Sequence, residues 1–196
     1  MRILLLGNSY TAALHLPEKL AEALSAEVVA HTRGGARLAE QLNEKTKLGS
    51  RTQKALKEEK WDYVILQEMS KGPVIYPERY LESVAKLSKQ IKENGAVPVI
   101  YCTWAYQKDS PVMEKAVMEK EPFSYEEMYQ KLEAMCHQAA QENGALLADV
   151  GTGFFQAKEN LYAQDGSHPN ALGVEKIVEV LAQTIRQDGI KNVNSK

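Results

Sequence analysis

The chain has 196 residues, of which 26% are charged and 44% are hydrophobic, and it carries a formal net charge of −2. This length and composition predict one folded domain, residues 1–196, with a sizeable core. Lys and Arg are scattered among Asp and Glu, which argues against nucleic acid or a membrane surface as a partner. Because no apolar run is long enough for a signal peptide or a membrane span, we expect a cytoplasmic protein.

Apolar runs rich in β-branched residues alternate with helical patterns along the chain. The predicted strands are residues 2–6, 27–31, 62–66, 97–102 and 145–149. The predicted helices are residues 17–25, 36–58, 77–94, 123–143 and 171–187. Such alternation predicts an α/β fold in which a five-stranded parallel, flavodoxin-like sheet lies between two helix layers, a three-layer α/β/α domain.

Local signals mark the ends of several helices. Pro17 suits the first turn of a helix, and Asn170 can cap the last helix. Gly95 and Gly144 each follow an Asn and come just before a strand, which is typical of a helix C-terminus. A polar tail, residues 189–196, is predicted after the last helix.

Small and polar residues follow the predicted strands. The first strand runs into GNSYT, the second into TRGGARL, the third into LQEMSKG and the fourth into CTWAYQ, and the loop AQDGSHPNALG precedes the last helix. In an open α/β sheet, ligands bind at the carboxyl ends of the strands. A serine, a pair of glycines, a glutamine, an aspartate and a histidine are therefore predicted to meet at one edge of the sheet.

Ser9 in GNSYT is the first candidate for chemistry. The Gly and Asn before it tolerate a tight backbone, and a serine at a strand end can stand exposed as a nucleophile. A serine in such a place is more often a turn residue. The segment DGSH has the same two interpretations, since it can form an Asx turn or supply Asp165 and His168 as partners of Ser9. Together, the two segments favour the catalytic interpretation.

These segments resemble the SGNH hydrolases, also called GDSL esterases and lipases, over nearly the whole chain. The resemblance makes Ser9 in GNS the nucleophile, with an Asn where the family usually has an Asp before the serine. It makes Asp165 and His168 in DGSHPN the closing Asp-x-x-His pair, which is the strongest match. In TRGGAR, Gly35 matches the glycine whose backbone N–H helps to form the oxyanion hole, and Gly34 is the alternative.

One segment departs from the family pattern. The family usually has Gly-x-Asn-Asp after the third strand, and its Asn side chain donates to the oxyanion, whereas this chain has VILQEMS there. Some SGNH-like carbohydrate esterases place a Gln at this point. The resemblance therefore assigns the role of third oxyanion donor to Gln67, which carries the same amide on a stem one methylene longer. Alternatively, a Gln at a strand end can simply satisfy the backbone of a loop.

The residue types suit this chemistry. A serine hydroxyl needs a base to take its proton, which His168 can do, and Asp165 can fix the tautomer of that imidazole and stabilise its charged form. The backbone N–H groups of Ser9 and Gly35, with the Gln67 amide, can bind the oxyanion of a tetrahedral intermediate. We expect neither a cofactor nor a metal.

The predicted function is a serine hydrolase that cleaves a carboxylic ester of a small molecule through an acyl-enzyme. A small acyl group such as acetyl, on a carbohydrate or another small molecule, is the leading substrate by analogy. One alternative is a thioesterase or lysophospholipase that acts on longer acyl chains, and another is a non-catalytic carbohydrate- or ligand-binding protein on the same scaffold. The first loop, GNSYTA, has neither of the glycine patterns typical of nucleotide binding.

Other side chains near the predicted edge have candidate roles. Asn8, Trp104 and Tyr106 are predicted substrate contacts. The long segment 104–122 is predicted to form either a lid or a short helix packed on the domain. Glu68, beside Gln67, is interpreted as a carboxylate that is exposed or salt-bridged, with a second catalytic acid as the alternative.

The remaining cysteines and histidines are interpreted as structural. Cys102 and Cys136 lie in strand and helix patterns, which favours reduced core thiols over a disulfide or a zinc site. His15, His31 and His137 have no matching partner pattern, so they are predicted to be structural or exposed.

Overall fold

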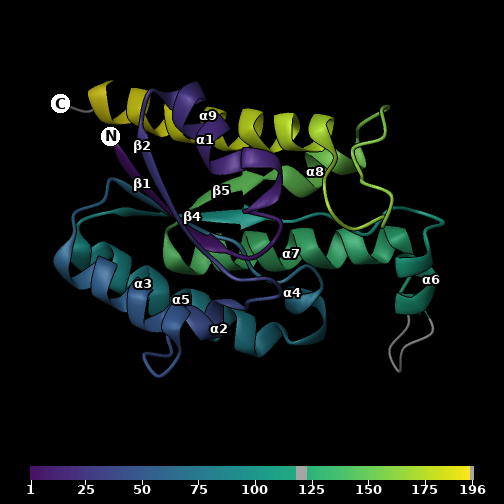
Figure 1. Ribbon diagram of the computed structural model, residues 1–196, viewed down its shortest axis with the longest axis horizontal. Helices are drawn as coiled ribbons and strands as arrows, with labels where there is room; N and C mark the ends of the chain where they lie inside the picture. Colours follow the sequence, from purple (N-terminus) through teal and green to yellow (C-terminus); the bar gives the residue numbers. More distant parts are fainter. Residues whose placement is uncertain (118–122, 195–196) are drawn as a thin grey trace.

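The computed structural model describes residues 1–117 and 123–194 and shows a parallel five-stranded sheet in the order β2-β1-β3-β4-β5. The strands are β1 (Arg2–Gly7), β2 (Glu27–Thr32), β3 (Tyr63–Leu66), β4 (Val97–Cys102) and β5 (Leu146–Asp149). Helices cover both faces of the sheet (Figure 1). The predicted α/β/α class and the flavodoxin-like strand order are confirmed.

The apolar runs become strands that are buried on both faces, as parallel sheets require. Along β1, Ile3 and Leu5 belong to one core cluster, while Leu4 and Leu6 belong to the other. All four side chains are at most 1% exposed. Because successive side chains point to opposite faces of a strand, this continuous apolar run is what a central strand needs.

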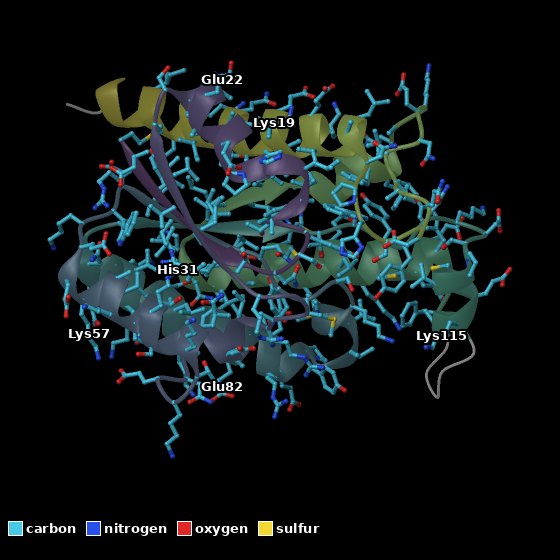
Figure 2. The ribbon with its side chains drawn as sticks, in the orientation of Figure 1. Lys19, Glu22, His31, Lys57, Glu82 and Lys115 are labelled. Atoms are coloured by element: carbon cyan, nitrogen blue, oxygen red, sulfur yellow. The ribbon has the colours of Figure 1, made fainter. Side chains whose placement is uncertain are left out.

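The helix layers divide along these two clusters. On the face of Ile3 and Leu5 lie α1 (Leu16–Leu24), α8 (Val150–Phe155) and α9 (Ala171–Asn194). On the opposite face lie α2 (Leu38–Gln41), α3 (Lys47–Glu58), α5 (Pro77–Asn94) and α7 (Tyr125–Asn143). The short elements are η1 (Ala13–His15), α4 (Gly72–Ile75) and α6 (Pro111–Val117). Figure 2 shows charged side chains such as Glu22 and Glu82 at the outer edges of the two helix layers.

The predicted single helix over 36–58 is wrong, because the segment forms two helices, α2 and α3. Between them, the Asn43 carbonyl accepts a hydrogen bond from the backbone N–H of Thr46 at 2.9 Å. The Thr46 side chain then accepts one from the N–H of Gly49 at 3.0 Å and starts α3 as its N-cap. A capping threonine inside an otherwise helical pattern therefore supplies a second helix start.

The residues predicted to mark helix starts and ends are confirmed, whereas the predicted end of the last helix at residue 187 is wrong. Pro17 lies in the first turn of α1. Gly95 and Gly144 end α5 and α7 with φ values of 93° and 49°, a left-handed conformation that suits glycine. The Asn170 side chain accepts a hydrogen bond from the N–H of Gly173 at 2.9 Å at the start of α9. That helix continues through Asn194, so most of the predicted tail is helical, and none of the described helices is long and apolar enough to cross a membrane.

Candidate active site

The loop that carries Ser9 leaves the carboxyl end of β1 and is held by side chains on both sides. The Asn8 Oδ1 accepts a hydrogen bond from the N–H of Tyr10 at 3.0 Å, and the Asn8 Nδ2 donates to the carbonyl of Ala36 at 3.2 Å. Gly7 allows close packing here, since a Cβ at this position would lie 2.3 Å from the Thr11 hydroxyl. The loop thus places Ser9 at the carboxyl edge of the sheet, beside the turn that follows β2.

The loop that precedes α9 carries the predicted Asp-x-x-His pair. Asp165 Oδ1 accepts hydrogen bonds from the N–H groups of Ser167, at 3.0 Å, and His168, at 2.9 Å. Its other oxygen, Oδ2, lies 2.6 Å from His168 Nδ1. Gly166 has a φ of 68°, and a Cβ there would lie 2.5 Å from the Ser110 Cβ. Asp165 therefore builds the Asx turn and also contacts the imidazole, so the turn leaves both residues available as partners of Ser9.

The two loops meet at the serine. His168 Nε2 lies 2.8 Å from Ser9 Oγ, which completes a continuous chain of contacts from Ser9 through His168 to Asp165. An ionised carboxylate can only accept hydrogen bonds, so the imidazole carries its proton on Nδ1. The lone pair on Nε2 then faces the Ser9 hydroxyl, as proton transfer from that hydroxyl requires.

Hydrogen bonding keeps Asp165 ionised. Partial burial by itself would raise the pKa of this carboxyl, but the N–H of Ser167, the His168 ring and the N–H of His168 all stabilise the charged form. The net effect lowers the pKa of Asp165 below its ordinary value. The pair is open to solvent, since 41% of the His168 side chain and 52% of the Asp165 side chain are exposed.

The glycine pair forms a turn beside the loop that carries Ser9. The N–H of Ala36 donates to the carbonyl of Arg33 at 2.9 Å, which closes a β-turn with Gly34 and Gly35 in the middle. Gly35 has a φ of 67°, a left-handed conformation that favours glycine at this position of a turn. Both glycines are exposed, so this backbone is accessible next to Ser9.

Gln67 lies at the end of β3 and is 1% exposed. Its Oε1 accepts hydrogen bonds from the N–H of Asn8 and from the hydroxyl of Thr11, both at 2.9 Å. Its Nε2 donates to the carbonyl of Glu68. In this geometry the amide holds the loop that carries Ser9, which is the alternative interpretation of a Gln at a strand end, and donation to an oxyanion stays a prediction.

The sequence matches no protein-family model and no curated protein. Among solved structures, a protein from Slackia heliotrinireducens, described as a candidate SGNH hydrolase, is 49% identical to this chain. The match covers 94% of this chain and 98% of that chain, with a TM-score of 0.89. The chain belongs to the SGNH hydrolases.

Two further solved structures share the fold of this SGNH hydrolase at lower identity. A DUF4886 family protein from Bacteroides uniformis is 21% identical over 94% of this chain and 82% of that chain, with a TM-score of 0.71. An acetylxylan esterase from Geobacillus stearothermophilus is 15% identical over 94% of this chain and 93% of that chain, with a TM-score of 0.66. These two similarities support the fold alone.

Glu68 is buried in this SGNH hydrolase, so the expectation of an exposed or salt-bridged carboxylate is wrong. Its oxygens accept hydrogen bonds from the N–H groups of Met69, at 2.7 Å, and Leu38, at 3.1 Å. Burial raises the pKa of the Glu68 carboxyl, although these two N–H groups and the charge of Arg37 act in the opposite direction. Glu68 thus links the end of β3 to the start of α2.

The three predicted substrate contacts are all buried, Asn8 at 3%, Trp104 at 0% and Tyr106 at 6% exposure. Asn8 bridges two loops, as described above. The Trp104 Nε1 donates to the carbonyl of Ser167 at 3.0 Å, and the Tyr106 hydroxyl lies 2.7 Å from the hydroxyl of Ser70. This geometry does not support a substrate contact for them, because each has its polar atoms bonded to the protein.

The segment after β4 supports the His168 loop. The N–H of Gln107 donates to the carbonyl of Gly166 at 2.8 Å, in addition to the contact from Trp104. Helix α6 packs Met113 against Phe123 in a small apolar cluster that includes residues of α7. The described part of 104–122 is therefore a short helix and a bracing loop packed on the domain, while residues 118–122 of the predicted lid lie outside the described residues.

Most of the residues interpreted as structural have a clear place. Cys102 and Cys136 are buried free thiols, as predicted. His31, labelled in Figure 2, is 3% exposed, and its Nδ1 lies 3.0 Å from the hydroxyl of Thr52 on α3. Burial, and secondarily the charge of Arg51, lowers the pKa of His31 to about 4. His31 is therefore a neutral core histidine.

One group of possible metal ligands occurs among the residues that the structure describes. Ligand atoms of Glu133, His137 and Asp149 all lie within 4.8 Å of one another. The Asp149 carboxylate already accepts hydrogen bonds from the N–H of Thr152, at 3.1 Å, and from its hydroxyl, at 2.6 Å. This capping of α8 accounts for the place of Asp149, so we assign the group no role in metal binding.

Proposed function

We propose that this SGNH hydrolase cleaves carboxylic esters through an acyl-enzyme formed on Ser9. The observation that carries the proposal is the contact of 2.8 Å between Ser9 Oγ and His168 Nε2, with Asp165 at 2.6 Å on the other ring nitrogen. A serine, an imidazole and a carboxylate in this order form the arrangement that activates a hydroxyl for attack. The same contacts argue against a purely ligand-binding role, since binding needs no such alignment.

The geometry supports the following steps. Ser9 Oγ attacks the ester carbonyl carbon while His168 Nε2 takes the hydroxyl proton, and Asp165 stabilises the imidazolium. The tetrahedral intermediate then collapses, the bond to the alcohol oxygen breaks, and the proton passes from His168 to that oxygen. In the second half, His168 takes a proton from water, which attacks the acyl-enzyme, and returns it to Ser9 as the acid leaves.

The oxyanion formed in each half needs donors that point at it. We assign the backbone N–H groups of Ser9 and Gly35 to this role, because the Gly35 turn is exposed and tied to the Ser9 loop through Asn8. Gln67 is the third donor that the family resemblance implies. Its Nε2 donates to the Glu68 carbonyl in this structure, so donation to an oxyanion requires its second N–H or a shift of the amide on substrate binding.

We further propose that the acyl group transferred to Ser9 is small, such as the acetyl group of an acetylated carbohydrate. Two observations support this choice. The histidine and aspartate are open to solvent, which suits a bulky polar alcohol that stays outside while a short acyl group is cleaved. One of the proteins with this fold is an acetylxylan esterase.

A hydrolysis screen tests the proposal. Purified protein and a Ser9→Ala control are assayed on p-nitrophenyl esters of increasing acyl length and on an acetylated sugar, and both are treated with a fluorophosphonate probe. We expect turnover of short acyl esters and labelling of the parent protein alone. A preference for long acyl chains would favour the thioesterase or lysophospholipase alternative, and the absence of both turnover and labelling would favour a binding protein.

A further inference from the structure

Tyr10 directly follows the nucleophile and contacts the loop of the general base. Its hydroxyl lies 2.5 Å from the Ser167 Oγ, and the residue is 4% exposed. Ser9 and Tyr10 thus contact His168 and Ser167, respectively, so two consecutive residues of one loop pair with two consecutive residues of the other. The contact between Tyr10 and Ser167 lies next to the reacting atoms, but neither of its hydroxyl groups takes part in the proposed reaction.

Aromatic stacking fixes the ring of Tyr10. It stacks on Trp104 with centroids 4.7 Å apart and planes at 12°, and Trp104 stacks on Phe154 at 4.0 Å and 6°. The Tyr10 ring also meets the His168 ring edge-on, with centroids 5.2 Å apart. Because buried stacked rings have little freedom to move, the Tyr10 hydroxyl is a fixed point in the core.

Ser167 is held from two directions by this stack. Its hydroxyl meets Tyr10, and its carbonyl accepts the hydrogen bond from the Trp104 indole at 3.0 Å. The side chains of Asp165 and His168 in the same loop are more open, since 52% of the first and 41% of the second are exposed. Hydrogen bonds between Asp165 and His168 keep the loop in shape but do not fix its distance from Ser9.

We propose that Tyr10 is a positioning residue that holds His168 in register with Ser9 through its hydrogen bond to Ser167. The proposal rests on the proposed function, because it concerns the alignment of the nucleophile and its base. A misplacement of about 1 Å in such a pair can cost on the order of a hundredfold in rate. The stack therefore fixes the position of the two loops relative to each other, whereas the Asp165 turn fixes the shape of the loop that carries His168.

The test compares variants that remove this hydrogen bond from either side. Tyr10→Phe keeps the stacked ring, Ser167→Ala keeps both backbone contacts, and the double variant removes both hydroxyls. The matched control is Tyr101→Phe, because the Tyr101 hydroxyl is buried in the same core cluster and has no hydrogen-bond partner among the residues that the structure describes. The measurements are kcat and KM on p-nitrophenyl acetate, the second-order rate of fluorophosphonate labelling, and Tm.

Each single variant should lower kcat and the labelling rate by roughly 10- to 100-fold with KM changed less than about threefold. The double variant should lose no more than either single variant, because one interaction is removed in each case. Ser167→Thr keeps the hydroxyl that Ser167→Ala removes, and its kcat and labelling rate should be close to those of the parent protein. Tyr101→Phe should keep the parent kcat and labelling rate.

Wild-type kcat and labelling in folded Tyr10→Phe and Ser167→Ala would overturn the positioning role while leaving the proposed function intact. Multiplicative losses in the double variant would also overturn it, since the two hydroxyls would then act separately. If Tyr10→Phe does not fold, Ser167→Ala on the partly exposed loop decides the question alone. A parent protein that neither hydrolyses esters nor reacts with the probe would refute the proposed function and this inference with it.

Discussion

Gln67 offers a sharp test of how the site is built, because two roles are open to it. As an oxyanion donor it would act on the transition state alone, whereas its observed contacts with Asn8 and Thr11 hold the nucleophile loop before substrate binds. A Gln67→Leu substitution removes both roles while keeping a side chain of similar size. The stability of the free protein and its kcat therefore report on different roles.

The contacts set the expected stability change. Gln67→Leu deletes the acceptor for the N–H of Asn8 and for the Thr11 hydroxyl, both at 2.9 Å and both buried. A buried donor without a partner costs about 1–3 kcal/mol, so the loss of two acceptor contacts should lower the free energy of unfolding by about 2–6 kcal/mol. At about 2–4 °C per kcal/mol for a domain of this size, Tm should fall by roughly 4–24 °C.

The assay pairs thermal and urea denaturation with kcat on a short acyl ester. Thr11→Val is the matched control, because it keeps the shape of the residue and removes one donor without leaving an unpaired group, and it should cost only about 0.5–1.5 kcal/mol. An unchanged Tm for Gln67→Leu would refute the reasoning about the loop. An unchanged kcat in the folded variant would refute donation of the amide to the oxyanion.

Gln67→Glu adds a pH dependence to the same test. One carboxyl oxygen can still accept the hydrogen bond from the N–H of Asn8. The other oxygen takes the place of the amide nitrogen beside the Glu68 carbonyl, and it can donate to that carbonyl only when it is protonated. Burial and that carbonyl should raise the folded-state pKa of this carboxyl above its value of about 4.3 in the unfolded chain. The variant is then least destabilised below that value and loses stability as pH rises through the folded-state pKa. Urea denaturation should show a larger deficit against the parent at pH 8 than at pH 5, and equal deficits would contradict the argument.

Four further predictions concern other parts of the site and the core. Ser9→Ala and His168→Ala should each lower kcat by about 10⁴-fold or more, with little further loss when combined, and additive losses would contradict a shared mechanism. Asp165→Asn should leave Tm nearly unchanged but lower kcat severely with little change in KM, because the favoured tautomer is lost. Gly35→Ala should destabilise the protein by about 1 kcal/mol through its left-handed φ and slow turnover, which urea denaturation and initial rates will show. Burial lowers the pKa of His31 to about 4, whereas the pKa of this side chain in the unfolded chain is about 6.5. The stabilisation by neutral His31 is therefore complete above that unfolded-state value, and the free energy of unfolding should fall by about 2 kcal/mol from pH 8 to pH 5. Urea titrations should show that His31→Leu removes this change.

Much of the fold was predictable because its signals are local. Uninterrupted apolar runs marked all five strands to within a residue or two, and the glycines at 95 and 144 marked helix ends through a backbone conformation that other residues adopt at a cost. The break between α2 and α3 was missed because the apolar pattern continues across it. Thr46, which starts α3 as its N-cap, is the local signal of the break, and it lies inside the predicted helix.

The candidate site was predictable in its reacting groups and not in their supports. Ser9, Asp165 and His168 occur in short motifs whose residue types are dictated by the chemistry. By contrast, no spacing rule links Tyr10 to Ser167, which are 157 residues apart in sequence. Trp104 was predicted to supply apolar surface for substrate near the site, but Tyr10 and Phe154 both stack on its ring, and Trp104 is completely buried.

Gln67, at the end of β3, shows how one side chain can both support the site and take the place of a family residue. A buried amide offers an acceptor and a donor at once, and in this chain the acceptor is used for the nucleophile loop while the donor reaches the Glu68 carbonyl. The neighbouring Glu68 carboxylate holds the start of α2 through the N–H of Leu38, just after the Gly35 turn. Two consecutive side chains at the end of β3 therefore fix the two loops from which the proposed oxyanion donors come. A substitution at either position should disturb the oxyanion hole even if its own side chain never touches substrate.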